Sequence, residues 1–392
     1  MHGLCDLRPR MPRRSDRGLE IALMARKLMK GNEAICHGAV AAGCAAFFGY
    51  PITPQNEIPE KMSTLMPDNG RAFVQAESEV AAINMVFGAA STGKRAMTSS
   101  SSPGISLKQE GISYIAACEL PCVIVNVQRG GPGLGTIFAG QVDYFQAVKG
   151  GGHGDYHTLT IAPWSAQECY DFMPLAFDLA DKYRNPVLVL MDGIIGQMIE
   201  PAELHPVEVH DYPKPWAANG ARGRAHNIIN SLWMDPKTLE NLNERLQAKY
   251  EEAARQEVRY HQYMTEDAEL ILVAYGSTAR ICRTVVDLAR EDGMKVGLFR
   301  PVTLFPFPSA QIAELARVGK RFMSVEMSTG QMVEDVRLAV NGMADVAFYG
   351  RTGGAIPTPT EILDKVRATF GKPPSISHYP KTAGPEDREV SH

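Results

Sequence analysis

Residues 72–99 read AFVQAESEVAAINMVFGAASTGKRAMTS, and this stretch contains two short apolar runs separated by a longer one. The runs at 72–75 and 95–99 have the length of β-strands, whereas the apolar segment 79–91 is long enough for a helix. A strand, a helix and a second strand in this order predict a βαβ unit, in which the two strands lie parallel. The predicted fold class is therefore α/β.

The same alternation continues on both sides of this unit. In the first half we expect further strands at 46–50, 122–128, 159–162 and 187–191, with helices near 31–43, 55–65, 104–118 and 165–184. The second half, from Glu269, contains four strand-like runs, ELILVAYGS, KVGLFRP, RFMSVEM and DVAFYG, with helices around 278–291, 309–317, 330–341 and 360–369. The two series predict two α/β domains, each with a mostly parallel sheet.

Shifts in composition indicate where these domains begin and end. The Pro- and Gly-rich residues 205–224 interrupt the alternation, and a charged helix that Asp235 can cap follows them. We divide the chain into a basic N-terminal extension at 1–28, a first domain at 29–230, a linker helix at 231–266, a second domain at 267–372 and a tail at 373–392. We expect the extension to be disordered, and the tail to be disordered or ordered only against a partner. Met24 and Met29 are candidate natural starts.

The distribution of charge argues against nucleic acid as a partner. The chain has 40 Lys or Arg and 44 Asp or Glu, a net charge of −4, and since residues 1–30 contribute +5 the remainder carries −9. An acidic core does not attract nucleic acid or an anionic membrane surface. The chain also contains no run of about 18 apolar residues that could span a membrane.

The seven cysteines argue against a metal or iron–sulfur centre held by this chain. None of them forms a CxxC pair, and most stand among small or apolar residues, where a free Cys acts as a small hydrophobic group. An odd number of cysteines in a long chain favours a reducing compartment, so we predict a cytoplasmic protein. His153 and His157 flank Asp155 in a glycine-rich loop, but a pair of this kind is more often structural, and we assign no metal.

One segment resembles a phosphate-binding loop by its letters alone. Gly88 to Lys94 satisfies the pattern GxxxxGK, which requires a strand before it, a helix after it and a Ser or Thr next to the Lys. Here the expected helix precedes, an expected strand follows and the next residue is Arg95. We interpret Gly93 as the end of the helix and Lys94 as a cation favoured there by the helix dipole, so a nucleotide hydrolase is a weak alternative.

Three residues with useful chemistry follow expected strands. Glu79 comes soon after 72–75, Arg129 ends 122–128, and Thr53 lies in the turn YPITP after 46–50. Ligands of open α/β sheets bind beyond the carboxyl ends of the strands, so these side chains can share one site. A carboxylate among apolar residues suits proton transfer, and a guanidinium suits a carboxylate or phosphate ligand. Each residue also has a purely structural explanation. Glu79 can stabilise the first turn of a helix, Arg129 can be a surface residue at a strand end, and Thr53 can belong to a turn that its prolines make rigid.

Five motifs, in this order, resemble the α subunit of the 2-oxoacid:ferredoxin oxidoreductases, most closely the type acting on 3-methyl-2-oxobutanoate (2-oxoisovalerate). They are GYPITPQNEIPE, QAESEVAAINMVFGAA, TSSSSPGISLKQEGISY, VIVNVQRGGPGLGT and RPVTLFPFP, and the resemblance spans roughly residues 29–370. It implies a pyrimidine-binding domain for thiamine diphosphate, a parallel sheet with helices on both faces, followed by a smaller α/β domain like the C-terminal domain of transketolases.

The resemblance also implies what individual residues do. Glu79 would hydrogen-bond N1′ of the cofactor's aminopyrimidine and share a proton with it, Thr53 would lie near the substrate, and Arg129 would hold the substrate's carboxylate. Pro51 and Ile52, in the same turn as Thr53, would contact the cofactor. The implied reaction is the oxidative decarboxylation of a 2-oxoacid with coenzyme A to an acyl-CoA, CO₂ and reduced ferredoxin. The expected substrate is branched; 2-oxoglutarate, an aryl-2-oxoacid or a catalytically silent scaffold subunit are alternatives.

This chain lacks the part of the site that holds the diphosphate. Thiamine enzymes use a GDG motif and a later Asn for the diphosphate and its Mg²⁺, whereas Met191-Asp192-Gly193 lacks the first Gly and Asn219 lies in the Pro-rich interruption. The resemblance therefore implies a hetero-oligomer, in which a β subunit supplies these groups and γ and ferredoxin-like δ subunits join it. Mg²⁺ and the [4Fe–4S] clusters would lie on these partners. Arg300 and Glu326 have no chemical assignment, and we expect them to orient an interface.

Overall fold

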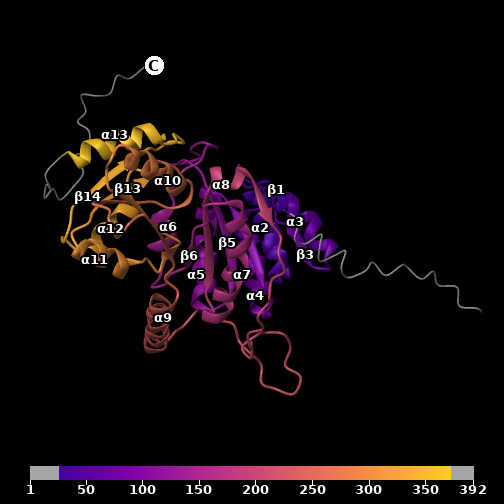
Figure 1. Cartoon of the computed structure of the whole chain (residues 1–392). Coiled ribbons are helices and arrows are strands. Elements are labelled where there is room, and N and C mark those ends of the chain that lie inside the picture. The colour runs from indigo at the N-terminus through magenta and orange to yellow at the C-terminus, as the bar shows by residue number, and fades with distance from the viewer. Residues whose placement is uncertain (1–25, 372–392) are drawn as a thin grey trace, which may run out of the picture.

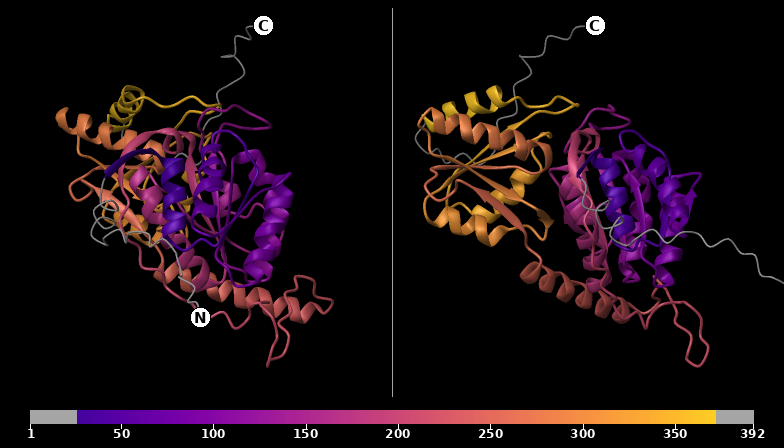
Figure 2. Two further views of the ribbon diagram at one scale, coloured as in Figure 1. Left: turned by 90° about the vertical axis from the view of Figure 1, so that its right-hand side faces the viewer. Right: turned by 45° about the vertical axis from the view of Figure 1, so that its right-hand side comes forward.

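The computed structural model describes residues 26–371, which form two α/β domains lying side by side (Figure 1, Figure 2). The first domain is built on seven strands in the order β12-β6-β7-β5-β4-β2-β3, and the second on five in the order β14-β13-β10-β11-β9. The fold class and the succession of two sheets are as predicted.

The first sheet is parallel except at one edge, where β12 runs antiparallel to β6. Its strands are β2 (Ala46–Gly49), β3 (Ala72–Gln75), β4 (Ala96–Ser100), β5 (Cys122–Gln128), β6 (Leu159–Ile161), β7 (Pro186–Asp192) and β12 (Thr303–Phe305). Helices α2 (Gly31–Ala41), α3 (Glu57–Asp68) and α7 (Ala166–Tyr183) cover one face, and α4 (Glu79–Ser91) and α5 (Ser102–Ala117) cover the other.

The central strand β5 shows why the strands of this sheet have continuous apolar sequences. Val123 and Val125 pack into the core on the side of α2 and α7, whereas Ile124 packs on the side of α4 and α5. Successive side chains of a strand face opposite layers, so a strand with a helix on each side is apolar at every position.

The second sheet contains the four predicted strands, β10 (Leu270–Val273), β11 (Val296–Pro301), β13 (Arg321–Glu326) and β14 (Val346–Gly350), all parallel. Helices α10 (Gly276–Glu291) and α13 (Pro359–Phe370) cover one face. Helices α11 (Ser309–Arg317) and α12 (Met332–Val340) cover the other face, and their core cluster continues into the first domain. The two domains therefore share part of one hydrophobic core.

Several elements differ from the sequence prediction because they depend on pairing between distant segments. Strand β12 comes from the second half of the chain but joins the first sheet, and β9 (Tyr260–Tyr263), within the expected linker 231–266, joins the second sheet. Strand β1 (Arg26–Lys30) pairs with β8 (Ile199–Glu203). Residues 26–28, which we assigned to the N-terminal extension, therefore belong to this strand. The rest of the extension, and the tail from 372, lie outside the described residues. The short helices α6 (Tyr144–Val148) and α8 (Gly193–Gln197) were not predicted.

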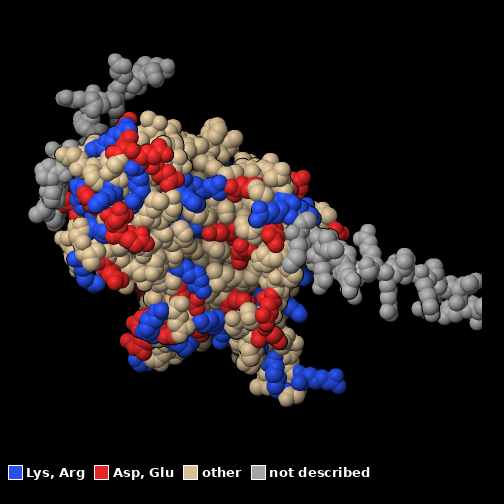
Figure 3. All heavy atoms as spheres, in the orientation of Figure 1, with Lys and Arg blue, Asp and Glu red and all other residues tan. Residues whose placement is uncertain are grey.

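The charged linker helix is α9 (Pro236–Gln256), which runs along one end of both domains (Figure 2). Asp235 caps it by accepting a hydrogen bond from the backbone N–H of Thr238 at 3.0 Å. Its buried stripe consists of Leu242, Leu246, Tyr250 and Ala253. Basic and acidic side chains are interspersed over the face of the molecule seen in Figure 3.

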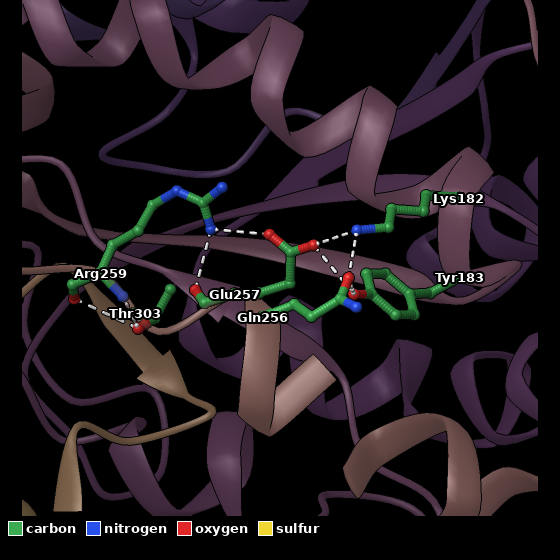
Figure 4. Close-up of polar contacts among 6 residues, drawn as sticks. All are labelled: Lys182, Tyr183, Gln256, Glu257, Arg259 and Thr303. Carbon is green, nitrogen blue, oxygen red and sulfur yellow. Dashed lines mark hydrogen bonds and ion pairs between the residues drawn. The ribbon is translucent and has the colours of Figure 1, made fainter. Parts of the chain in front are cut away.

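The end of α9 is fixed to the first domain through one carboxylate, that of Glu257 (Figure 4). Lys182 and Tyr183, at the end of α7, donate to its Oε1 at 2.6 and 2.9 Å, and Arg259 donates to its Oε2 at 3.0 Å. Burial would raise the pKa of Glu257, but these three hydrogen bonds hold it below its ordinary value. The backbone N–H of Arg259 then donates to Thr303 on β12, so the chain enters the second domain along the edge of the first.

Within residues 26–371, none of the helices combines the length and the apolar character needed to cross a membrane. The six cysteines in this part of the chain are free thiols, and all except Cys118 are buried.

Candidate functional site

Glu79 lies at the start of α4, where the sequence left its role open between capping and chemistry. Ser78 is the N-cap, because its Oγ accepts a hydrogen bond from the backbone N–H of Ala81 at 3.1 Å. The neighbouring Glu77 is exposed, whereas Glu79 is only 6% exposed. The helix therefore does not need the Glu79 carboxylate as a cap, and that carboxylate faces the interior.

The Glu79 carboxylate lies against the first turn of α5, where Gly104 leaves room for it. A Cβ at Gly104 would stand 2.6 Å from Oε1 of Glu79 and 2.1 Å from Oγ of Ser100, closer than atoms can approach. The Ser100 hydroxyl is buried and has no hydrogen-bond partner among the described residues. The carboxylate and the unpartnered hydroxyl thus fill the recess that the absent side chain of Gly104 leaves.

Arg129 follows β5 and is held by neutral groups. Its two terminal nitrogens donate to the backbone carbonyls of Thr53 at 3.0 Å and Leu134 at 2.9 Å, while its Nε is buried without a partner in the described chain. The residue is 7% exposed. A buried guanidinium whose bonded partners are carbonyls keeps most of its positive charge available for an anionic ligand.

Thr53 lies in the turn between β2 and α3, and this turn holds the Arg129 side chain through the Thr53 carbonyl. The Thr53 hydroxyl accepts a hydrogen bond from Nδ2 of Asn56 at 3.3 Å and is half-buried. Pro51 is exposed and Ile52 half-buried in the same turn. The structure therefore brings Thr53 and Arg129 into direct contact, while the cofactor contacts of Pro51 and Ile52 stay predictions.

The turn between β4 and α5 joins Glu79 to the other two residues. Ser100 and Gly104 contact Glu79, and Ser102, between them, accepts a hydrogen bond from the backbone N–H of Arg129 at 3.0 Å. This turn is part of the motif TSSSSPGISL, to which the sequence alone assigned no role. The sequence signal that could have identified it is a run of serines followed by Pro and Gly at the start of a helix, because glycine allows other groups to approach the backbone closely.

Asp143 is a second residue that sequence reasoning missed. Its Oδ2 accepts hydrogen bonds from Oγ of Ser102 at 2.6 Å and Nδ2 of Asn126 at 2.9 Å, behind Arg129. Burial raises the pKa of Asp143, while these two donors and the charge of Arg129 act in the opposite direction. Nothing near it in the sequence marks it, because its partners come from α5 and β5.

An open cavity of about 640 Å³ adjoins this turn at the boundary between the domains. Its lining is mostly polar or glycine-rich and consists of Ser102, Pro103, Ser106, Gly131, Pro132, Gly133, Val142, Asp143, Thr329, Gln331 and Thr352. The two domains together therefore form a space beside Ser102 that is large enough for a small organic ligand.

The weaker sequence candidates have structural roles. Asp192 is fully buried, with Oδ1 capping α8 and Oδ2 accepting from the backbone N–H of Ser277 at 2.9 Å, while Asn219 is exposed elsewhere. Their placement does not form a diphosphate site. Lys94 is exposed after α4 and before β4, in the order opposite to a phosphate-binding loop.

The histidine pair does not form a metal site in the described residues. The His157 ring stacks on Phe305 with centroids 4.1 Å apart, and burial lowers its pKa. No group of three or more His, Cys, Asp or Glu side chains between residues 26 and 371 is arranged to hold a metal ion.

Arg300 joins the two domains, whereas Glu326 acts within the second domain. Arg300 reaches from β11 into the first domain, where it donates to Glu168 at 2.9 Å and to the carbonyl of Ala162 at 3.0 Å. Glu326 accepts from the backbone N–H groups of Gln331, Met332 and Val333 and so caps α12.

Residues 37–266 match the family described as pyruvate flavodoxin/ferredoxin oxidoreductase, thiamine diP-bdg, and residues 268–362 match pyruvate:ferredoxin oxidoreductase core domain II. The chain belongs to the 2-oxoacid:ferredoxin oxidoreductase family. It is 53% identical over 350 residues to the ketoisovalerate oxidoreductase subunit VorB of Methanothermobacter marburgensis, covering 89% of this chain and 99% of that protein. It is 38% identical to the 2-oxoglutarate synthase subunit KorA of the same organism, covering 86% and 97%.

Among solved structures, 2-oxoglutarate:ferredoxin oxidoreductase from Magnetococcus marinus, with 2-oxoglutarate, coenzyme A and succinyl-CoA bound, matches with a TM-score of 0.79 at 26% identity. The match covers 88% of this chain and 65% of that longer chain. An inactive tetramer of a split-gene transketolase matches with a TM-score of 0.53 at 11% identity, covering 86% of this chain and 96% of that chain, which shows a shared fold.

The residues of this oxidoreductase subunit fit the pyrimidine half of thiamine diphosphate. The recess at Gly104 presents a buried carboxylate oxygen and an unpartnered hydroxyl, which are groups that bind a ring nitrogen and an amino group. Glu79 and Ser100 would therefore hold the aminopyrimidine.

Proposed function

We propose that this chain is the α subunit of a 2-oxoisovalerate:ferredoxin oxidoreductase, an enzyme that decarboxylates a branched 2-oxoacid oxidatively and passes the acyl group to coenzyme A. The main support is that two buried side chains meet the same turn, between β4 and α5. Arg129 is bonded to carbonyls and its backbone contacts this turn, and the Glu79 carboxylate lies against it. The first residue supplies a site for the substrate's carboxylate, and the second supplies a proton-sharing carboxylate for the cofactor.

The choice of a branched substrate rests on the relatives. The more similar relative, at 53% identity, is named for ketoisovalerate, and the one at 38% identity is named for 2-oxoglutarate.

The residues of this chain perform binding and proton transfer. Arg129 holds the carboxylate of the 2-oxoacid, and the carbonyls of Thr53 and Leu134 hold Arg129 in place. Glu79 holds or releases a proton at N1′ of the aminopyrimidine. Thiamine diphosphate, when bound, supplies the nucleophilic carbon and the electron sink for loss of CO₂. Gly104 lets the carboxylate approach closely, and the packing of α4 on α5 keeps water from it.

The remaining components are proposed to lie on partner subunits. A β subunit would hold the diphosphate and Mg²⁺ with a [4Fe–4S] cluster, because Asp192 uses both carboxylate oxygens in contacts within this chain. Gamma and ferredoxin-like δ subunits would carry electrons to ferredoxin. The free cysteines suit a reducing compartment, and we propose the cytoplasm.

The test is a comparison of substrates on the complete complex. We expect kcat/KM to be highest for 2-oxoisovalerate among 2-oxoisovalerate, 2-oxoglutarate, pyruvate and an aryl-2-oxoacid, measured by CoA-dependent reduction of ferredoxin. A preference for 2-oxoglutarate would overturn the substrate assignment. Two further measurements separate an active subunit from a silent scaffold. A complex built on a silent scaffold would contain no thiamine diphosphate, or it would oxidise none of the four 2-oxoacids.

Replacing Arg129 tests the carboxylate site. A charge-assisted hydrogen-bonded contact contributes about 1.5–3 kcal/mol, so Arg129→Met should lower kcat/KM for the 2-oxoacid by about 10- to 150-fold. Most of the loss should appear as a raised KM, while the KM for coenzyme A changes little. Arg255→Met, at an exposed position on α9, is the control and should leave both values unchanged. An unchanged KM for the oxoacid in Arg129→Met would contradict the assignment.

A further inference from the structure

Helix α5 buries a lysine on its inner side, one turn beyond the recess that holds Glu79. Lys108 has no exposed surface, and its Nζ donates to Oγ1 of Thr98 at 3.0 Å and to the carbonyl of Ser99 at 3.4 Å. Both of these partners are neutral. An ammonium buried with only neutral partners is costly, so a charged group nearby or a function must account for it.

The Glu79 carboxylate lies against the side of α5 that carries Lys108. Lys108 lies four residues after Gly104, so the two positions share one side of α5, and the Glu79 carboxylate lies against Gly104. Burial lowers the pKa of Lys108 from 10.5 to about 8, and the Glu79 carboxylate acts in the opposite direction by attracting its charge. Near neutral pH, the buried Lys108 side chain therefore carries a positive charge.

The other elements packed around Lys108 contribute no competing charge in the described chain. Strand β4 presents the hydroxyl of Thr98 and the carbonyl of Ser99, and α4 presents Glu79. The Ser99 hydroxyl is occupied, because it donates to Oε1 of Gln55 at 2.6 Å. Glu79 is therefore a charged group on which the Lys108 ammonium can act across α5.

We propose that Lys108 is a positioning residue for Glu79, whose ammonium favours the ionised carboxylate so that the shared proton rests on N1′ of the bound aminopyrimidine. The step is a proton transfer between Oε of Glu79 and that ring nitrogen, with no other bond made or broken. A nearby cation lowers the proton affinity of a carboxylate, and without it the proton stays on Glu79. This inference rests on the proposed function and adds a residue to it.

The first measurement needs no cofactor. The melting temperatures of the cofactor-free complex, wild type and Lys108→Met, are compared between pH 6.5 and 9.5. Since the pKa of Lys108 is about 8 in the fold and higher when unfolded, the unfolded state binds more protons above pH 8. Wild-type stability relative to Lys108→Met should therefore be constant below about pH 8 and rise above it.

Repeating this comparison in the Glu79→Gln background tests the coupling directly. Loss of the carboxylate removes an attraction that raises the pKa of Lys108, so the rise should begin at a lower pH. The same onset in both backgrounds would overturn the proposal. If Lys108→Met does not assemble, Lys108→Gln serves for the same cycle.

The second measurement follows turnover in the loaded complex. Lys108→Met should lower kcat about tenfold at pH 7, with the KM for the 2-oxoacid within about twofold. It should also lose the wild-type decline in kcat above about pH 8, and Lys108→Arg should restore most of the rate. Wild-type kcat and an unchanged pH profile in Lys108→Met would refute the role.

Lys249 provides a matched control, because burial also lowers its pKa to about 8 but its acidic partner is the half-buried Glu119, between α5 and β5. Lys249→Met should alter stability and leave the pH dependence of kcat unchanged. A wild-type complex that oxidises none of the 2-oxoacids would refute the proposed function, whereas an active complex insensitive to Lys108 would refute this inference alone.

Discussion

The Glu79→Gln complex is expected to assemble normally and to lose about 10²- to 10⁴-fold of its kcat, the range for removal of a positioned proton-transfer group. Glutamine keeps the size of the side chain in the recess at Gly104, so the packing of α4 on α5 should survive. It cannot exchange a proton with N1′, and the reaction loses the group that moves the proton. The measurement is CoA-dependent ferredoxin reduction with 2-oxoisovalerate.

Glu77→Gln is the matched control, because Glu77 is exposed two residues earlier and carries the same charge. It should retain wild-type kcat. Thiamine diphosphate content should be measured in both variants, so that loss of turnover is separated from loss of cofactor. Near-normal turnover in a Glu79→Gln complex that holds its cofactor would show that the carboxylate is not the proton-sharing group.

Removal of the Arg300 side chain is expected to cost up to about 3–5 kcal/mol of folding free energy, the range for breaking a fully buried ion pair on one side, because the remaining Glu168 side chain is 23% exposed. Arg300 is 1% exposed, and its guanidinium also lies 4.3 Å from the ring of Trp164. In Arg300→Met, Glu168 loses its cation and the Ala162 carbonyl loses a donor. The measurement is the free energy of unfolding in urea, or the melting temperature where unfolding is irreversible.

Two further variants make this expectation specific. Arg280 also joins the domains, through Glu200 at 2.6 Å, but its side chain is 36% exposed, so Arg280→Met should cost only about 1 kcal/mol or less. Adding Glu168→Gln to Arg300→Met should recover part of the loss, since the unpaired carboxylate is removed. A cost for Arg300→Met no larger than that of Arg280→Met would contradict the buried-pair interpretation.

Local patterns predicted most of the fold. The strands β5 and β10 are where the apolar runs indicated, because a strand covered on both faces must be apolar throughout. Pairings between distant segments were not predictable in this way. Strand β12 joins the first sheet although its sequence neighbours belong to the second, and β9 and β1 pair with strands far along the chain.

The candidate site was likewise predictable from the sequence in part only. The residue types at Glu79, Arg129 and Thr53, and their positions after strands, were visible in the sequence, since strand ends of a parallel sheet lie at one edge. The motifs that resemble the oxidoreductase family were equally visible there. Only the tertiary structure separated the buried Glu79 from the exposed Glu77, and only it placed the Thr53 carbonyl on Arg129. It also buried Lys108 one helical turn after Gly104, against which the Glu79 carboxylate lies. Burial and charge depend on which segments pack together, and no local pattern encodes that.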